Sequence, residues 1–369
     1  MSLIRSTNST TSMQLFDTIA SMGHEQLVIC NDSSAGYRGI IAIHSTTLGP
    51  ALGGTRFWQY ANDDEAIVDA LRLARGMTYK NAVAGLNLGG GKSVIIGDNK
   101  TSDREMIFRA HGRFVESLGG RYITAEDVGT STADMDFVHM ETKNVSGLAG
   151  RSGDPSPVTA HGVFRAIQAS AKERWGSDDL STKTVSVQGA GHVGYYLMKE
   201  LHEAGATLIV TDIDAERVKQ VVQEFGARAV APEDIYAVQA DIFAPCALGG
   251  IINDKTLPQL KCEILAGAAN NVLLEAENHG VALEERGILY APDYVANAGG
   301  VINVYSELAG WSSARSFRKA DEIYDTILKV FAIAKSDRVP TYVAADRLAE
   351  QRIKAVGSMV RTWPQWPNK

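Results

Sequence analysis

Residues 185–194 read Val-Ser-Val-Gln-Gly-Ala-Gly-His-Val-Gly, an apolar run that leads directly into the pattern Gly-x-Gly-x-x-Gly. The apolar run is typical of a buried strand, and residues 194–205 have the spacing of a helix. Gly189 permits a tight turn, Gly191 lets a pyrophosphate approach the backbone, and Gly194 permits close packing of helix against strand. This stretch therefore predicts a strand–turn–helix unit that binds a dinucleotide.

The next predicted strand, residues 207–211, ends in Asp212. A carboxylate at that place accepts hydrogen bonds from ribose hydroxyls and repels a 2′-phosphate, so the predicted cofactor is NAD rather than NADP. The free N–H groups at the helix N-terminus favour the phosphates. Ala190, His192 and Val193 lie in the turn itself, where His192 either brings a cation near the phosphates or has no role.

Strands alternate with helices after residue 157, which favours an α/β fold with a parallel, doubly wound sheet. The expected strands of this part are residues 184–188, 207–211, 242–244, 264–266 and 288–290, and the expected helices are 159–175, 194–205 and 215–225. Residues 150–157, Gly-Arg-Ser-Gly-Asp-Pro-Ser-Pro, are the strongest linker signal. We therefore expect a Rossmann-type NAD-binding domain over residues 148–334.

The remaining residues, 1–147 with about 335–369, are expected to form an α/β domain for substrate binding and oligomerisation, to which C-terminal helices return. Here the expected strands are residues 27–31, 39–45 and 121–124, and the expected helices are 63–75, 102–118 and 344–356, while a further helix, 321–335, ends at the boundary between the two domains. Gly76 is expected to end its helix, and residues 49–56 are expected to form a turn suited to backbone contact with a ligand or to serve as an ordinary connection.

Composition narrows the possible partners. The chain has 369 residues, 45% of them hydrophobic and 21% charged, as in ordinary two-domain enzymes. Its net charge of −7, without a long Lys/Arg block, argues against nucleic-acid binding. No apolar run reaches the roughly 18 residues that span a membrane, and the Ser/Thr-rich start does not resemble a secretory signal, so we expect a cytoplasmic protein. Cys30, Cys246 and Cys262 are too scattered for disulfide or metal-ligand spacing and are interpreted as buried thiols.

Two lysines and an aspartate are the candidates for chemistry. Lys92 follows three glycines and precedes Val-Ile-Ile, so burial is expected to lower its pKa and suit it to general acid–base work. Lys80 either holds a substrate carboxylate or is a surface lysine. Asp127 follows a predicted strand end, as active-site carboxylates often do, but turn aspartates are common in such places too.

Residues 86–94, Leu-Asn-Leu-Gly-Gly-Gly-Lys-Ser-Val, resemble the glycine-rich active-site signature of the glutamate/leucine/phenylalanine/valine dehydrogenases. Further similar blocks occur in the same order at residues 49–56, 76–80, 124–129, 244–249, 268–271 and 292–300. The resemblance covers about Leu15 to Ile353. Asn99 departs from the signature, and the Trp/Pro-rich residues 363–367 match nothing in the family.

The resemblance implies an oxidoreductase that reversibly deaminates an L-amino acid to a 2-oxo acid and ammonia, with NAD accepting the hydride. It implies that Lys92 is the general base, that Asp127 handles the amino group and proton transfers, and that Lys80 binds the carboxylate. We expect Lys80 also to be the positive neighbour that lowers the pKa of Lys92. Gly53, Gly54 and Asn271 would assist substrate binding, and the other expected cofactor contacts are Thr159, Cys246, Ala247 and Asn270. Relatives form homo-oligomers, which is the basis for expecting one here.

The family places its substrate side-chain contacts at Leu52, Met77, Ala125, Val301 and Val304, all apolar in this chain. That favours leucine, valine and isoleucine over glutamate, which needs a cation for its second carboxylate. Tyr305, where leucine enzymes usually carry a small residue, keeps an aromatic amino acid such as phenylalanine or tryptophan as an alternative. An alternative of another class is a non-catalytic NAD- or amino-acid-binding protein, against which the intact Lys80, Lys92 and Asp127 argue.

Overall fold

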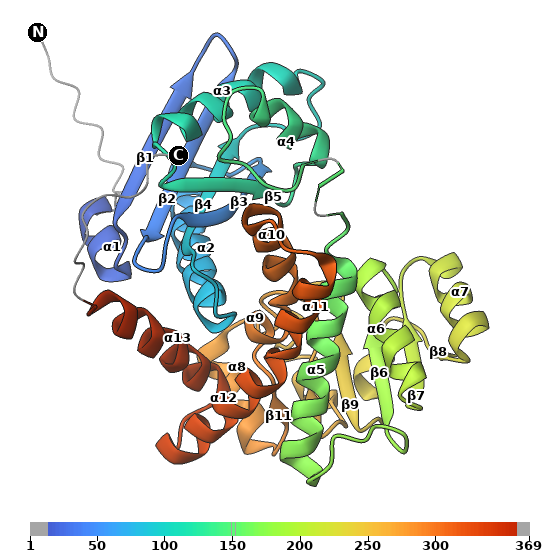
Figure 1. Cartoon of the computed structure of the whole chain (residues 1–369). Helices are drawn as coiled ribbons and strands as arrows, with labels where there is room; N and C mark the ends of the chain where they lie inside the picture. The colour runs from blue at the N-terminus through green and yellow to red at the C-terminus, as the bar shows by residue number, and fades with distance from the viewer. Residues whose placement is uncertain (1–13, 149, 152, 360–369) are drawn as a thin grey trace, which may run out of the picture. The chain divides into compact units, whose positions relative to one another are not determined.

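The structure, a computed structural model, describes residues 14–148, 150–151 and 153–359. The described chain divides into two compact units, each with its own β-sheet (Figure 1). Unit 1 contains the described residues up to Thr46, with Pro50–Thr78 and Gly89–Val145. Unit 2 contains Thr47–Gly49, Tyr79–Leu88 and the described residues from Ser146 onward.

Unit 1 is built on a five-stranded mixed sheet with the order β1-β2-β4-β3-β5. Its strands are β1 Gln26–Asp32, β2 Tyr37–Ser45, β3 Ala51–Trp58, β4 Gly89–Ile96 and β5 Tyr122–Glu126. Strands β1 and β4 pair antiparallel with β2, whereas β3 pairs parallel with both β4 and β5. Strand β3 thus lies inside the sheet, and its neighbours end at the same edge.

The prediction of a turn at residues 49–56 was wrong, because most of this block is strand β3. Its glycines serve close packing between strands. A Cβ atom on Gly53 would lie 1.7 Å from the carbonyl oxygen of Gly91, and one on Gly54 would lie 2.6 Å from that of Glu126. The crowding requires glycine at both places, and the glycines remove the side-chain alternation by which a strand is normally recognised.

The helices of unit 1 include one that the sequence predicted to be shorter. They are α1 Leu15–Met22, α2 Asp63–Val83, α3 Arg104–Ser117 and α4 Thr132–His139, and the last turn of α2 belongs to unit 2. Helix α2 does not end at Gly76 but continues to Val83. A glycine costs a helix only about 1 kcal/mol relative to alanine, and buried residues on both sides, such as Leu71 and Ala82, offset that cost.

Unit 2 is built on a six-stranded, fully parallel sheet with the order β11-β10-β9-β6-β7-β8. Its strands are β6 Thr184–Gln188, β7 Thr207–Thr211, β8 Arg228–Ala229, β9 Ile242–Pro245, β10 Ile264–Leu265 and β11 Leu289–Tyr290. The chain builds outward from β6 to β8, then returns to the other side of β6 with β9. This reversal confirms the predicted doubly wound α/β fold and creates a crevice where ligands bind in such sheets.

The helices of unit 2 include the C-terminal segment. They are α5 Ser156–Trp175, α6 His192–Glu203, α7 Ala215–Phe225, α8 Ala276–Glu285, α9 Asp293–Ala296, α10 Gly299–Ala309, α11 Ser313–Asp321, α12 Ile323–Asp337 and α13 Thr341–Gly357, with short 3₁₀ turns at Ile235–Ala237 and Leu257–Gln259. No helix in the described part of the chain is long and apolar enough to cross a membrane.

Helix α13 contacts the segment Tyr79–Leu88, which belongs to the predicted first domain but groups with unit 2. The Tyr79 hydroxyl donates to Glu350 at 2.9 Å, and Arg352 donates to the Leu86 carbonyl at 2.7 Å. The contacts therefore place residues 341–357 in unit 2 rather than unit 1. The division of substrate binding and cofactor binding between two domains stays a prediction.

The three cysteines lie apart, and none forms a disulfide. Cys30 and Cys262 are buried, whereas Cys246 is only half-buried. Burial raises the pKa of Cys30 to about 11 and the pKa values of Cys246 and Cys262 to about 12.

Candidate active site

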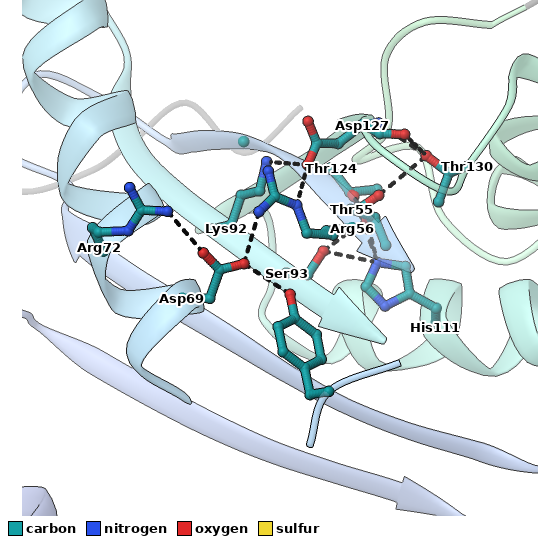
Figure 2. A network of polar contacts seen from close by, with 12 residues as sticks. Thr55, Arg56, Asp69, Arg72, Lys92, Ser93, His111, Thr124, Asp127 and Thr130 are labelled. Carbon is teal, nitrogen blue, oxygen red and sulfur yellow. Dashed lines mark hydrogen bonds and ion pairs between the residues drawn. The ribbon is translucent and has the colours of Figure 1, made fainter. Parts of the chain in front are cut away.

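Lys92 lies in strand β4, in which every residue from Gly89 to Ile95 is buried. Only 6% of its side chain is exposed, and its Nζ lies 2.7 Å from Oδ2 of Asp127. Figure 2 shows the two side chains meeting from neighbouring segments of unit 1. Burial lowers the pKa of Lys92, and the Asp127 carboxylate opposes this shift without cancelling it. A lysine that gives up its proton more easily is suited to act as a base.

Asp127 directly follows strand β5, as predicted, and is held from two directions. Its backbone N–H donates to the Thr130 hydroxyl at 2.9 Å, and that hydroxyl donates to the Thr55 carbonyl at 3.1 Å. Its carboxylate contacts Lys92 and Arg56. Burial alone would raise the pKa of Asp127, but these two cations more than compensate and lower it. The carboxylate therefore stays ionised and able to accept protons.

Arg56, on β3, is the positive neighbour of Lys92 within unit 1 and adds to the lowering of its pKa. The sequence predicts Lys80 in this role, but Lys80 belongs to unit 2. Arg56 Nε lies 3.1 Å from Oδ2 of Asp127, and a terminal nitrogen of the same guanidinium lies 2.8 Å from Asp69. Asp69 also accepts from the Tyr60 hydroxyl at 2.8 Å. Sequence reasoning missed Arg56 and Asp69 because no short spacing links them with Asp127.

A buried polar network lies beside this cluster and joins three strands to helix α3 (Figure 2). The Thr55 hydroxyl is within 2.7 Å of the Ser93 hydroxyl and 3.0 Å of His111 Nε2. The Tyr122 hydroxyl donates to the Gly53 carbonyl at 2.7 Å. Burial lowers the pKa of His111 to about 3, so this imidazole is neutral. The network fixes the strands that carry Lys92 and Arg56.

Lys80 lies near the end of helix α2 and, like its partner Asn270, belongs to unit 2. Its Nζ is 3.5 Å from Oδ1 of Asn270, which also accepts from Asn297 at 2.8 Å. The adjacent Asn271 has φ of 50°, a left-handed conformation that is uncommon outside glycine. The next N–H, of Val272, donates to the partly buried Asp293 carboxylate at 2.8 Å. The structure thus brings Lys80, Asn270 and Asn271 together.

The glycine turn after β6 has the geometry that the sequence predicts. Gly189 has φ of 105° and its N–H donates to the Thr211 carbonyl at 2.8 Å. A Cβ atom on Gly194 would lie 2.0 Å from the Gly189 carbonyl oxygen, whereas the nearest atom to one on Gly191 would be a terminal nitrogen of Arg217 at 3.8 Å. The turn is therefore closed at Gly194 and open at Gly191, where a pyrophosphate could approach the backbone.

Asp212 follows strand β7, at the predicted ribose position, and its carboxylate also stabilises the glycine turn. Its Oδ2 accepts from the Ala190 N–H at 2.6 Å. His192 and Val193 begin helix α6, and the His192 side chain is exposed. Ile213, which follows Asp212, is 96% exposed, an unusual state for isoleucine that sequence reasoning did not anticipate.

The other expected cofactor contacts lie at the carboxyl ends of strands in unit 2 or beside them. Ala247 follows β9, and a Cβ atom on Gly189 would lie 3.0 Å both from the Ala247 Cβ and from the Cys246 backbone. Thr159, on α5, lies against the start of α10, where a Cβ atom on Gly300 would be 3.1 Å from its hydroxyl. These residues therefore lie at the edge of the doubly wound sheet at which folds of this kind bind nucleotides.

The five apolar positions expected to contact the substrate side chain are divided between the units. Leu52, Met77 and Ala125 belong to unit 1, and Val301 and Val304 lie on helix α10 in unit 2. Tyr305, the next residue of α10, packs edge-to-face on Trp311 with ring centroids 5.0 Å apart.

Two family models match almost the whole chain. Residues 24–144 match the Glu/Leu/Phe/Val dehydrogenase dimerisation domain, and residues 150–215 and 210–356 match the glutamate/leucine/phenylalanine/valine dehydrogenase model. The chain belongs to the Glu/Leu/Phe/Val dehydrogenase family. Membership confirms the resemblance seen in the sequence and the predicted enzyme class, an amino-acid dehydrogenase.

Relatives within the family differ in the amino acid that their names give. The leucine dehydrogenase of Geobacillus stearothermophilus is 60% identical over 347 residues, 93% of this chain and 94% of that protein. The valine dehydrogenase of Streptomyces albus is 51% identical over 90% of this chain and 92% of its own length. The crystal structure of L-tryptophan dehydrogenase from Nostoc punctiforme matches with a TM-score of 0.85 and 48% identity, covering 93% of this chain and 99% of that one.

Proposed function

We propose that this family member catalyses the reversible, NAD-dependent oxidative deamination of a branched-chain L-amino acid, leucine first, with valine and isoleucine as further substrates. The products are the 2-oxo acid, ammonia and NADH. The buried pair of Lys92 and Asp127, 2.7 Å apart, carries the proposal, because it supplies a base with a lowered pKa next to an ionised carboxylate. The 60% identity with a leucine dehydrogenase supports the choice of substrate.

The proposed roles follow from the charges. Asp127 grips the substrate amino group and takes a proton from it as the imine forms. Lys92, entering the step neutral, takes a proton from the water that attacks the imine carbon. Lys80 holds the substrate carboxylate as a point charge, with Asn271 and the backbone at Gly53 and Gly54 completing the contacts.

We assign the cofactor to the crevice in the sheet of unit 2. NAD, when bound, supplies the hydride acceptor. The N–H groups at the start of helix α6 would hold the phosphates, Asp212 would accept from the ribose hydroxyls, and the exposed Ile213 would offer an apolar contact to the adenine. We also propose a homo-oligomer, since residues 24–144 match a dimerisation domain.

An aromatic L-amino acid is the second candidate substrate. Tyr305 favours it, and so does the 48% identity with a tryptophan dehydrogenase of the same fold. The side-chain positions Leu52, Val301 and Val304 are apolar and accept either kind of side chain. Apolar pockets discriminate one methylene by only about 1–3 kcal/mol, so the preference has to be measured.

Two measurements test the proposal. Lys92→Ala should lower kcat by at least about 10²-fold while NADH binding is retained, and the exposed Lys100→Ala should leave both unchanged as a control. Wild-type turnover in Lys92→Ala would contradict the assigned chemistry. Values of kcat/KM for leucine, valine, phenylalanine and tryptophan should be highest for leucine, and a highest value for an aromatic would select the second candidate.

A further inference from the structure

Arg56 joins the Asp127 carboxylate to a second carboxylate that has no part in the proposed chemistry. Its Nε lies 3.1 Å from Oδ2 of Asp127 and its terminal nitrogen lies 2.8 Å from Oδ2 of Asp69. Asp69, on helix α2, is itself fixed by the Tyr60 hydroxyl at 2.8 Å and by Arg72 at 3.0 Å. The guanidinium is therefore clamped in one orientation.

The same oxygen of Asp127 receives both cations. Lys92 Nζ is 2.7 Å from Oδ2, and Arg56 Nε is 3.1 Å from it, as the dashed lines in Figure 2 show. A carboxylate held at one oxygen by two donors from different strands has little freedom to rotate. The side chain of Lys92 is almost wholly buried, and its Nζ contacts the Asp127 carboxylate. The orientation of that carboxylate therefore determines how Lys92 is placed for proton transfer.

We propose that Arg56, anchored by Asp69, is a positioning residue of the reaction that holds the Asp127 carboxylate against Lys92 and sets the charge balance around this pair. The inference rests on the proposed roles of Lys92 and Asp127. It extends the site by the ion pair between Arg56 and Asp69, and gives Asp69 a purpose in turnover as well as in folding.

Arg56 and Asp69 act in opposite directions on the pKa of Lys92. The charged groups that act on its pKa are Asp127 and Asp69, which raise it, and Arg56, which lowers it. Arg72 also contacts Asp69, but it is more than half exposed and solvent screens it. Removing Arg56 should therefore make Lys92 harder to deprotonate, and neutralising Asp69 should make it easier.

The network also opens to solvent on one side. Arg56, Asp69 and Arg72 line a pocket of ≈ 650 Å³ together with Tyr60 and Trp58. A small planar cation could enter this pocket and occupy the space of a deleted Arg56 side chain. The structure therefore provides for chemical rescue of a truncated variant by guanidinium ion.

The first experiment compares pH profiles of kcat/KM for oxidative deamination. Arg56→Gln should move the acidic limb by about one pH unit to higher pH, and Asp69→Asn should move it to lower pH. Arg38→Ala is the matched control, since Arg38 pairs with Asp63 on the exposed surface of the same unit. The proposal would be overturned if the acidic limb moved in the same direction in both variants, or did not move in either. A purely structural role gives no reason for the two variants to shift the limb in opposite directions.

The second experiment uses Arg56→Ala, which should lose about 10²-fold in kcat from misplacement of Asp127. Millimolar guanidinium chloride should raise the kcat of Arg56→Ala at least about tenfold, whereas sodium chloride at the same concentration should not. Wild-type kcat in Arg56→Ala, or failure of rescue in a variant whose Tm matches wild type, would overturn the role of Arg56. An active Lys92→Ala would instead refute the proposed function, so the two failures are distinguishable.

Discussion

Lys92 and Asp127 form an ion pair with a 2.7 Å separation, and only 6% of the lysine side chain is exposed. A buried charge that loses its partner usually costs about 3–5 kcal/mol. Lys92 has an alternative, because burial already lowers its pKa and it can shed its proton. The pair therefore links catalysis to the pH dependence of stability.

Asp127→Asn should lower kcat by at least about 10²-fold while the protein stays folded at alkaline pH. Without the carboxylate, the pKa of Lys92 in the folded state falls further below its unfolded value of 10.5. The unfolded state then binds more protons, so the variant should lose stability relative to wild type as pH falls below 10.5. Urea unfolding at several pH values measures this difference, and a constant difference would contradict the reasoning.

His111 should contribute to acid destabilisation. Burial lowers its folded-state pKa from 6.5 to about 3, so the unfolded state binds the proton more tightly between these values. Stability should therefore fall as pH drops from 6.5 toward 3, by up to about 1.4 kcal/mol per pH unit from this group. His111→Gln should show a shallower slope in urea unfolding over that range, and an identical slope would show that His111 is not the group responsible.

Two glycines of the turn after β6 should respond differently to alanine. Gly194→Ala should lower stability by about 1–3 kcal/mol, because the added methyl group would overlap the Gly189 carbonyl. Gly191→Ala should keep a wild-type Tm, since its Cβ meets no close neighbour, but should weaken NADH binding at least about tenfold by blocking the pyrophosphate. Thermal melts and NADH fluorescence titrations measure both. A stable Gly191→Ala that binds normally would place the cofactor elsewhere.

Asp212→Ser should raise the ratio of kcat/KM with NADP to that with NAD, because the carboxylate that repels a 2′-phosphate is gone. The variant should also lose about 1 kcal/mol of stability, because Ala190 N–H loses its acceptor. Asp214→Ser is the matched control. Asp214 caps helix α7 through the Glu216 and Arg217 N–H groups, which serine can also do. If the ratio of kcat/KM with NADP to that with NAD were the same in Asp212→Ser as in Asp214→Ser, Asp212 would not be the ribose contact.

Local patterns were sufficient for the first strands and helices of the parallel sheet in unit 2, although they did not predict β8 or the helices α8 to α11. Strands β6 and β7 and helix α7 begin and end where their residues predicted, because each carries a complete local signal of apolar run, turn and cap. Strand β3 was missed because its glycines are required by neighbouring strands that are close in space but distant in sequence. Helix α2 was cut short because a glycine was given more weight than the burial on either side of it.

The candidate site divides in the same way. Lys92 and Asp127 could be named from their flanking residues, since a lysine after three glycines and an aspartate after a strand are visible locally. The ion pairs of Arg56 join residues 13 and 71 positions apart, and only the pairing of β3 with β5 and the docking of α2 bring them together. Long-range electrostatics of this kind leave no period or spacing in the sequence.

The raised pKa values of the three cysteines have a practical consequence. With values of about 11 and 12, Cys30, Cys246 and Cys262 carry almost no thiolate at neutral pH, and thiolate is the form that maleimides attack. A cysteine introduced at an exposed place such as Lys100 would therefore react far faster than the native thiols. We therefore expect a single fluorophore or spin label to attach first to the introduced cysteine, and labelling of the wild type measures the background from the half-buried Cys246.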